Sequence, residues 1–487
     1  MTKKSLSIGV LSLCLLITPG LAAESALPTP KSPSDAAASA APATSATAVT
    51  FLPKFVFNPD ERTVLERFVG HATAYAARLT PEKVRKQCAA APERFAWVEF
   101  PSLACLLDAY ELTGDVRYLD TFRDRMTLFI DLLEPGDDGF LGWWGKPLEG
   151  HQGAKEHPEV RIDELQMNFI AISTLSHWVE LARRQPTYAA ANAAVIKRYL
   201  ALIEEHLYPK WDKRGFFIDL GAKGGSYRGL DYPLTNKENP GLTESHEKSS
   251  IMVNALLNLH RVTGKAIYLR RAIQLGTRFK HCLSLKDDHY EWMSWEPGGV
   301  WDAKPDQSDA WAIGWIAPDP HGYWYEAAAS IALNLYQYGL VFDDQDLARF
   351  LVTQKTRCWN GDLVAPIYRT VAGVSHADSK WVDGRHLSLT LALYDPDLSK
   401  LAFSGPHEAE NLKQSTDDWT GLIGIAGYVR TKYLLRPLMT AGPRPFEQFG
   451  KAFLAKPDNR AFVEKLRFTV TAPGCITPLK PSDLNPK

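Results

Sequence analysis

The feature that most limits the possible folds is a helical hairpin that occurs twice. Leu106–Leu119 and Leu256–Leu269 share the pattern Leu-Leu, then Thr-Gly, then Tyr-Leu, and they lie 150 positions apart. Glycine after a helix adopts the left-handed conformation that ends it, and the Tyr-Leu pair then begins the apolar face of a second helix. The repeat therefore predicts a fold assembled from antiparallel helix pairs.

Apolar residues recur at helical spacing over most of the chain after Phe55. The predicted helices are Glu61–Leu79, Phe100–Leu112, Val116–Leu133, Ile162–Ala182, Ala189–Leu207, His246–Val262, Ala266–Cys282, Tyr323–Tyr338, Asp346–Lys355 and Trp419–Leu435. Two segments alternate as strands do, Phe216–Leu220 and Arg467–Val470. The sequence therefore predicts a mainly α fold.

The predicted helices are of two kinds. One kind is small and apolar along most of its length, and its partners carry charge along one face, as in Arg117–Met126. The apolar kind begins near Phe100, Ile162, His246, His321, Gly384 and Asp418. Apolar helices inside a ring of amphipathic ones are typical of a closed helical barrel. The pattern resembles the (α/α)6 toroid of many carbohydrate-active enzymes over about residues 60–435, with a seventh hairpin as the alternative.

The N-terminus has the composition of a secretory leader, with Lys3 and Lys4 before an apolar run at Ser7–Thr18. The predicted organisation is a signal peptide at 1–23, an Ala/Pro/Ser/Thr-rich disordered linker at 24–52, one catalytic toroid at 53–470 and a tail at 471–487. We expect a periplasmic or secreted protein that does not insert into a membrane once the leader is removed.

The charge balance excludes bulk electrostatic binding of nucleic acid. The chain has 55 Lys and Arg against 56 Asp and Glu, a formal net charge of −1, whereas such binding needs a basic excess or stripe. Five cysteines follow the leader, and none form a Cys-x-x-Cys pair. This set allows one or two disulfides and does not predict a zinc knuckle.

Aromatic residues are concentrated before the apolar helices. Sugar rings stack on flat aromatic faces, and their hydroxyls bind planar polar groups. The predicted substrate-binding residues are Trp143, Trp144, Arg228, Asn236, Trp295, Trp301, Trp381 and His386. Packing of long loops onto the barrel is the alternative role for the tryptophans. We expect a cleft for a polysaccharide or oligosaccharide.

The segment His321-x-Tyr323-Trp324 resembles part of the Asn-Asn-His-x-Tyr-Trp signature of toroidal alginate lyases. Asp319 and Pro320 stand where that family has asparagines, so the amide that holds the uronate carboxylate is missing. The resemblance implies β-elimination on an anionic polymer such as alginate or a glucuronan, in which hydrogen-bond donors neutralise the carboxylate and Tyr or His transfers protons. The predicted catalytic residues are His246, His321, Tyr323, Tyr325, Arg161 and Glu244.

Hydrolysis is the alternative chemistry, because it needs two carboxyl groups, one as proton donor and one as base or nucleophile. The candidate carboxyl groups are Asp163, Glu164, Glu244, Glu326 and Asp418. Carboxylates in a first helical turn also complement the helix dipole without any catalytic role. The remaining alternatives are an unsaturated-glucuronyl hydrolase, a sugar 2-epimerase, which the chain also resembles loosely, and a glycan-binding toroid without catalysis. We assign no metal ion and no cofactor to the mechanism.

Overall fold

The computed structural model describes residues 49–147, 157–236, 241–304, 311–312, 323–374, 388–404, 408 and 419–466. Within these residues the chain is mainly helical, as predicted. The helices predicted from periodicity are present, with ends that differ by a few residues, except that Ala189–Leu207 is divided between two helices and a π-helical segment. The predicted leader, most of the linker, the tail and the strand at Arg467–Val470 lie outside the described residues.

The helices vary from single turns to about five turns. In chain order they are α1 (Pro59–Ala77), α2 (Pro81–Ala90), α3 (Phe100–Thr113), α4 (Arg117–Ile130), α5 (Leu165–Arg183), α6 (Pro186–Ala191), α7 (Ala193–Leu202), α8 (Pro209–Lys213), α9 (His246–Thr263), α10 (Ala266–Cys282), α11 (Tyr323–Gln337), α12 (Asp344–Val352), α13 (Pro396–Phe403), α15 (Trp419–Val429), α16 (Glu447–Leu454) and α17 (Pro457–Glu464). Short π-helical segments extend several of them, including Phe95–Glu99 before α3 and Arg430–Leu435 after α15.

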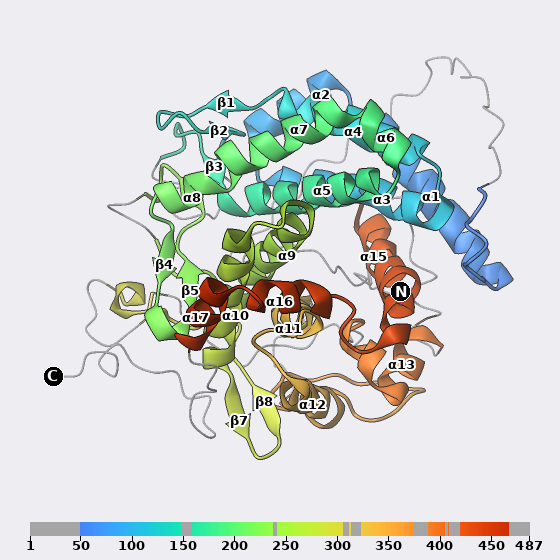
Figure 1. The fold of residues 1–487 in the computed structure, drawn as a ribbon, viewed down its shortest axis with the longest axis vertical. Helices are drawn as coiled ribbons and strands as arrows, with labels where there is room; N and C mark the ends of the chain where they lie inside the picture. Colours follow the sequence, from blue (N-terminus) through green and yellow to red (C-terminus); the bar gives the residue numbers. More distant parts are fainter. Residues whose placement is uncertain are drawn as a thin grey trace, which may run out of the picture.

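The long helices pack as an interior set and a covering set. α3 lies against α5, α5 against α9 and α9 against α11, while α15 packs on α3 (Figure 1). α4 covers α3, α7 covers α5, α10 covers α9 and α12 covers α11. α5 is buried over most of its surface, polar residues such as Gln166, Asn168 and Ser176 included, whereas α4 buries one apolar stripe. The two kinds of helix in the sequence therefore occupy the two layers.

Both copies of the repeated hairpin end their first helix as predicted. Gly114 follows α3 with φ of 73°, and Gly264 follows α9 with φ of 67°. Their N–H groups donate to the carbonyl groups of Tyr110 and His260. Glycine enters this left-handed conformation without the steric penalty of a Cβ atom, so each helix stops and the chain reverses into α4 or α10.

The strands of the described residues form four antiparallel ladders of two short strands each. The pairs are β1 (Glu134–Pro135) with β2 (Leu141–Gly142), β3 (Asp163–Glu164) with β6 (Asp231–Tyr232), β4 (Phe217–Asp219) with β5 (Gly225–Tyr227), and β7 (Ser284–Lys286) with β8 (His289–Glu291). The predicted strand at Phe216–Leu220 is β4. The β3–β6 ladder joins the start of α5 to the segment that leads into α9.

Two predicted helix starts are wrong. Asp163 and Glu164 pair as strand β3, and Glu164 is the N-cap of α5, accepting a 2.5 Å hydrogen bond from the backbone N–H of Met167. The apolar segment after Gly384, predicted as an interior helix, has from residue 388 onward only a 3₁₀ turn before α13. Asp395 is extended because Pro396 follows it, and a residue before proline disfavours the helical conformation.

Buried ion pairs join the last interior helix to the first. Arg430, just after α15, donates to both carboxylate oxygens of Asp108 in α3 at 2.8 Å, and the Asp108 side chain is fully buried. Lys432 binds Glu61 of α1 at 2.6 Å, and the hydroxyl of Tyr433 donates to the same carboxylate. The two ends of the helical array are therefore held together by charge as well as by packing.

Replacing Arg430 with methionine should lower the free energy of unfolding by about 3 kcal/mol, because the buried Asp108 loses the cation that compensates it. Adding Asp108→Asn to that variant should restore part of the loss. Urea unfolding followed by circular dichroism measures both effects. Arg198→Met is the control, because its pair with Asp131 is about half exposed, at 52% and 58%, and should contribute little. An unchanged unfolding midpoint in Arg430→Met would contradict this role.

Candidate functional site

A polar cavity of about 310 Å³ lies where the interior helices converge. Residues of α3, α5, α9 and α11 line it, together with Thr390 and the π-helical segment after α15. Its lining includes Ser250, Asn254, Asn258 and Asn334. A concave space with a few convergent polar groups is the usual form of a small-molecule site.

Glu326, at the start of α11, is the carboxyl group that lines this cavity. Its Oε1 accepts a hydrogen bond of 3.3 Å from Thr390, while its Oε2 has no hydrogen-bond partner among the described residues. Burial raises the pKa of Glu326 to about 7, although its hydrogen bonds oppose the shift. By contrast, the cavity residue Arg261 is paired with Glu180 at 3.0 Å. Glu326 can therefore hold or release a proton near neutral pH.

Buried carboxyl groups surround a lysine at the start of α9. Lys248 Nζ lies 3.4 Å from Glu244, and the charges of Glu93, Glu164 and Glu247 also act on it. These four carboxyl residues are between 0 and 7% exposed. Asp231 lies opposite Glu164 in the β3–β6 ladder. We define the carboxylate cluster as Glu93, Glu164, Asp231, Glu244, Glu247 and Lys248.

Short backbone contacts bring these separate segments together. The β3–β6 ladder places Glu164 beside Asp231, and the N–H of Glu244 donates to the carbonyl of Tyr227 at 3.0 Å. α9 begins two residues after Glu244, so Glu247 and Lys248 lie in its first turn. The helix dipole favours carboxylates such as Glu247 at this position.

The carboxylate cluster adjoins the polar cavity. Ser250 lines the cavity, and its hydroxyl donates to the carbonyl of Glu247 at 2.6 Å. Both residues lie in the first turns of α9, the helix that packs on α5 and on α11. The cluster and the cavity are therefore neighbours along α9, and Ser250, Ile251 and Asn254 of that helix line the cavity.

Burial gives the cluster an unusual set of protonation states. Burial raises the pKa of Glu164 well above its usual value, and the charges of Glu93 and Asp231 raise it further. Burial also raises the pKa of Glu244 to about 7, against the opposing effect of Lys248. Burial alone would lower the pKa of Lys248, but the carboxylates outweigh it and the pKa lies above its usual value. Near neutral pH the cluster thus offers both protonated and ionised carboxyl groups.

Asp163 belongs to a separate, structural ion cluster. Its Oδ2 binds Lys210 at 2.6 Å and Arg214 at 2.8 Å, and its Oδ1 accepts a hydrogen bond from Asn168 at 3.0 Å. All of these side chains are buried, and burial lowers the pKa of Lys210 to about 8. Because both oxygens of Asp163 are engaged, its predicted role as a hydrolytic carboxyl group is corrected to a structural one.

Two predicted sugar-stacking residues, Trp143 and Trp295, are corrected as well. Trp143 is fully buried and donates from Nε1 to the carbonyl of Phe129 at 2.8 Å. Trp295 is also buried and donates to the carbonyl of Thr243 at 2.6 Å. A ring without an exposed face cannot stack on a sugar, so these rings pack the loops onto the helices.

Arg161 and His246 lie in positions that do not suit their predicted catalytic roles. Arg161 is half exposed and pairs with Glu134 at 3.0 Å in a surface ion pair. His246 is buried, with its ring edge-on to Phe279 of α10 at 4.9 Å. Burial, and then the charge of Arg278, lower the pKa of His246 to about 3. The ring therefore stays neutral and faces the covering helix.

An exposed aromatic ring and a cation lie next to the carboxylate cluster. Trp301 is 38% exposed, and the guanidinium of Arg228 lies 5.0 Å from its ring centroid. The Trp301 indole N–H donates to the hydroxyl of Thr243 at 3.3 Å, and Thr243 precedes Glu244 in the chain. The two predicted binding residues, Trp301 and Arg228, therefore lie near Thr243, the residue that precedes Glu244 of the cluster.

Trp144 and Asn236 are half-buried, so a ligand can reach part of each side chain. Tyr323 and Tyr325 lie in the first turn of α11, but their side chains lie outside the description. Outside the described residues altogether are His321, Trp381, His386 and Asp418. The roles assigned to these residues stay predictions.

Four members of the cluster are not singled out by the sequence: Glu93, Asp231, Glu247 and Lys248. The one available signal is the charged pair Glu247-Lys248 at the start of an otherwise apolar interior helix. Glu93 and Asp231 come from connecting segments, and tertiary contacts alone bring them to α9.

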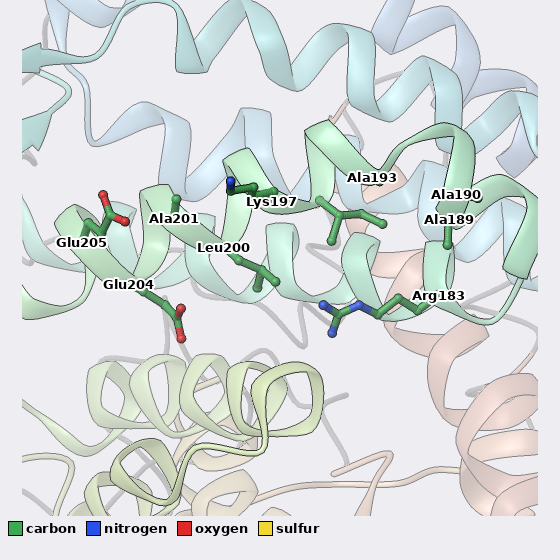
Figure 2. A pocket seen from close by; sticks show the side chains of 10 residues that line it. Arg183, Ala189, Ala190, Ala193, Lys197, Leu200, Ala201, Glu204 and Glu205 are labelled. Atoms are coloured by element: carbon green, nitrogen blue, oxygen red, sulfur yellow. The ribbon is translucent and has the colours of Figure 1, made fainter.

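A second hollow, of about 590 Å³, is lined by residues of α6, α7 and the π-helical segment Ile203–Leu207, together with Arg183 of α5 (Figure 2). Alanines form much of its wall, and Figure 2 shows Arg183 at one end with Glu204 and Glu205 at the other. Its charged groups therefore do not converge as those of the interior site do.

Comparison of the chain with protein-family models, curated proteins and solved structures gives no match. Among the described residues, no helix combines the length and the apolar character needed to span a membrane. Functional assignment therefore depends on the geometry of the site.

Glu326 should make stability depend on pH. Its folded pKa of about 7 exceeds the usual 4.5, so its contribution is fully present below pH 4.5 and is lost as pH rises through 7. Glu326→Gln should therefore raise the free energy of unfolding at pH 8 by up to about 3 kcal/mol, and the melting temperature with it. At pH 5 the same substitution should change both quantities little. Thermal melts at both pH values test this, with the exposed Glu82→Gln as the control. An equal effect of Glu326→Gln at both pH values would contradict it.

Proposed function

We propose that this chain is a carbohydrate-active enzyme that hydrolyses a glycosidic bond at the carboxylate cluster. The observation that carries the proposal is the convergence of buried carboxyl groups on Lys248 beside a polar interior cavity. Burying several carboxyl groups together is costly, and strongly shifted pKa values in a cavity are typical of functional sites.

The two roles that hydrolysis requires fall to different carboxyl groups. Glu164 is the proposed proton donor, because burial raises its pKa and keeps it protonated, and its Oε1 has no hydrogen-bond partner among the described residues. Glu244 is the proposed base or nucleophile, because Lys248 at 3.4 Å stabilises its carboxylate. Glu164 stays protonated and Glu244, with a pKa of about 7, can ionise near neutral pH; glycoside hydrolysis uses such a pair of one acid and one carboxylate.

The surroundings of the cluster favour a sugar without a carboxylate at the point of cleavage. The cluster has five carboxyl residues and one lysine, so an anionic ring placed against it would be repelled. Trp301 is 38% exposed, so part of its ring is accessible to a neutral pyranose, and Arg228, which lies over the ring at 5.0 Å, can bind hydroxyl groups.

The proposal includes the toroidal arrangement of the helices. The successive contacts of α3, α5, α9 and α11, and the return of α15 to α3, support a ring of helix pairs. In that arrangement the cluster lies at the N-terminal ends of the interior helices, the same end at which the sequence concentrates its aromatic loops.

β-Elimination on a uronate polymer, as the lyase resemblance implies, is the second proposal. One observation favours it: Arg228 is a half-buried cation next to Trp301 and close to Glu244, where it could bind a uronate carboxylate. In this mechanism Tyr323 and His321 transfer the protons.

A polysaccharide panel separates the two reactions. Neutral glucans, xylan and mannan should be tested beside alginate, glucuronan, pectate and hyaluronan, with reducing ends and the ultraviolet absorbance of unsaturated uronates measured together. We expect new reducing ends without the ultraviolet rise. A rise in both signals would overturn hydrolysis and support elimination, and binding without cleavage would identify a glycan-binding protein.

On the active polymer, Glu164→Gln and Glu244→Gln should each reduce kcat by about 10²–10⁴-fold, the usual contribution of a positioned acid or base. Circular dichroism should show that both variants remain folded. Glu205→Gln is the matched control, because this residue is exposed on the covering layer, and it should keep full activity. Full activity in both cluster variants would exclude the carboxylate cluster from catalysis.

A further inference from the structure

Three side chains with metal-binding chemistry meet between α9 and α10, apart from the carboxylate cluster. They are His246 at the start of α9, Cys282 at the end of α10 and Glu296 after β8. One ligand atom from each lies within 4.8 Å of the other two. His246 and Cys282 are each 4% exposed, and Glu296 is half-buried.

The histidine is arranged as a ligand that lacks a partner. Its Nε2 is buried and has no hydrogen-bond partner in the described part of the chain. Buried polar atoms of native proteins are almost always hydrogen-bonded, so an orphaned ring nitrogen calls for a specific explanation. A neutral imidazole with a ring nitrogen within 4.8 Å of a thiol and of a carboxyl group can bind a cation with them.

The ligand types select among metals. Thiolate and imidazole favour Zn²⁺ and other borderline or soft ions, whereas Ca²⁺ and Mg²⁺ prefer oxygen ligands alone. Imidazole nitrogen, thiolate sulfur and carboxylate oxygen are each zinc ligands in proteins, and zinc is usually four-coordinate. A fourth position would be filled by water.

We propose that His246, Cys282 and Glu296 bind one Zn²⁺ ion, which fastens the start of α9 to the end of α10. His246 is the first residue of α9, two positions after Glu244 and two before Lys248. A metal ion at His246 would therefore fix the helix turn that carries part of the carboxylate cluster. On binding, the Cys282 thiol loses its proton to solvent and forms a sulfur–zinc bond, with no change of oxidation state.

Zinc binding by the full-length chain, stripped with a chelator and titrated in competition with a chromophoric chelator, tests the proposal. We expect one Zn²⁺ per chain, and a Co²⁺-substituted protein with the intense absorption of four-coordinate cobalt and a thiolate-to-cobalt charge-transfer band. Cys282→Ser should remove that band and weaken zinc binding by more than about 100-fold. Mutating a residue that only hydrogen-bonds to a metal ligand already lowers metal affinity by about 10–100-fold, and losing a ligand should lower it more. Glu296→Gln should weaken binding while keeping the band.

Cys105→Ser is the matched control, because this buried cysteine lies in α3 and is also free, and it should bind zinc as the parent chain does. The cobalt spectrum is measured on the unsubstituted protein, so this test of thiolate binding remains valid even if Cys282→Ser fails to fold. The proposal is overturned if the stripped chain binds no stoichiometric zinc, or if the cobalt spectrum lacks the thiolate band.

Discussion

The buried pair between Asp108 and Arg430 sets the relation between the two ends of the helical array. Asp108 has no exposed side-chain surface, and both of its oxygens accept hydrogen bonds from one guanidinium. A carboxylate so placed requires its cation, which fixes the residue after α15 against the middle of α3. Because Arg430 must stay within reach of Asp108, the pair also opposes sliding of α15 along α3.

The start of α9 links the two polar clusters of the interior. α9 packs on α5 on one side and on α10 on another, and neighbouring residues of a helix point in different directions. Glu247 and Lys248 belong to the cluster shared with Glu164, while His246 lies against Phe279 of α10. One helical turn therefore supports both the proposed chemistry and the proposed metal ion.

Periodicity predicted the helices well because tertiary packing agreed with local preference. The glycines at 114 and 264 end their helices as the repeat indicated, since the left-handed position is a local requirement. The sequence did not predict the role of side chains whose burial depends on contacts between distant segments. Trp143 and Trp295 have the composition of a sugar cleft, and only their burial shows that they pack the core.

The candidate site was predicted in part for the same reason. Glu164, Glu244 and Glu326 are visible in the sequence, because each stands at the start of an apolar helix or just before it. Asp231 is not visible, because a ladder of two residue pairs brings it to Glu164 across a long stretch of chain. Sequence patterns indicate to within a few residues where most of these helices begin, and they do not identify which distant segment pairs with that beginning.

The β3–β6 ladder has a further effect on Asp163 and Glu164. Successive side chains of a strand point to opposite faces, so these adjacent and chemically similar residues enter separate environments. Asp163 meets Lys210 and Arg214, while Glu164 meets the carboxylate cluster. A shift of one residue in this pairing would place Glu164 against Lys210 and Arg214, and Asp163 in the carboxylate cluster. Insertions or deletions of one residue should therefore be much less tolerated here than substitutions. The alternation of side chains along β3 decides which carboxyl group joins the ion cluster and which joins the carboxylate cluster.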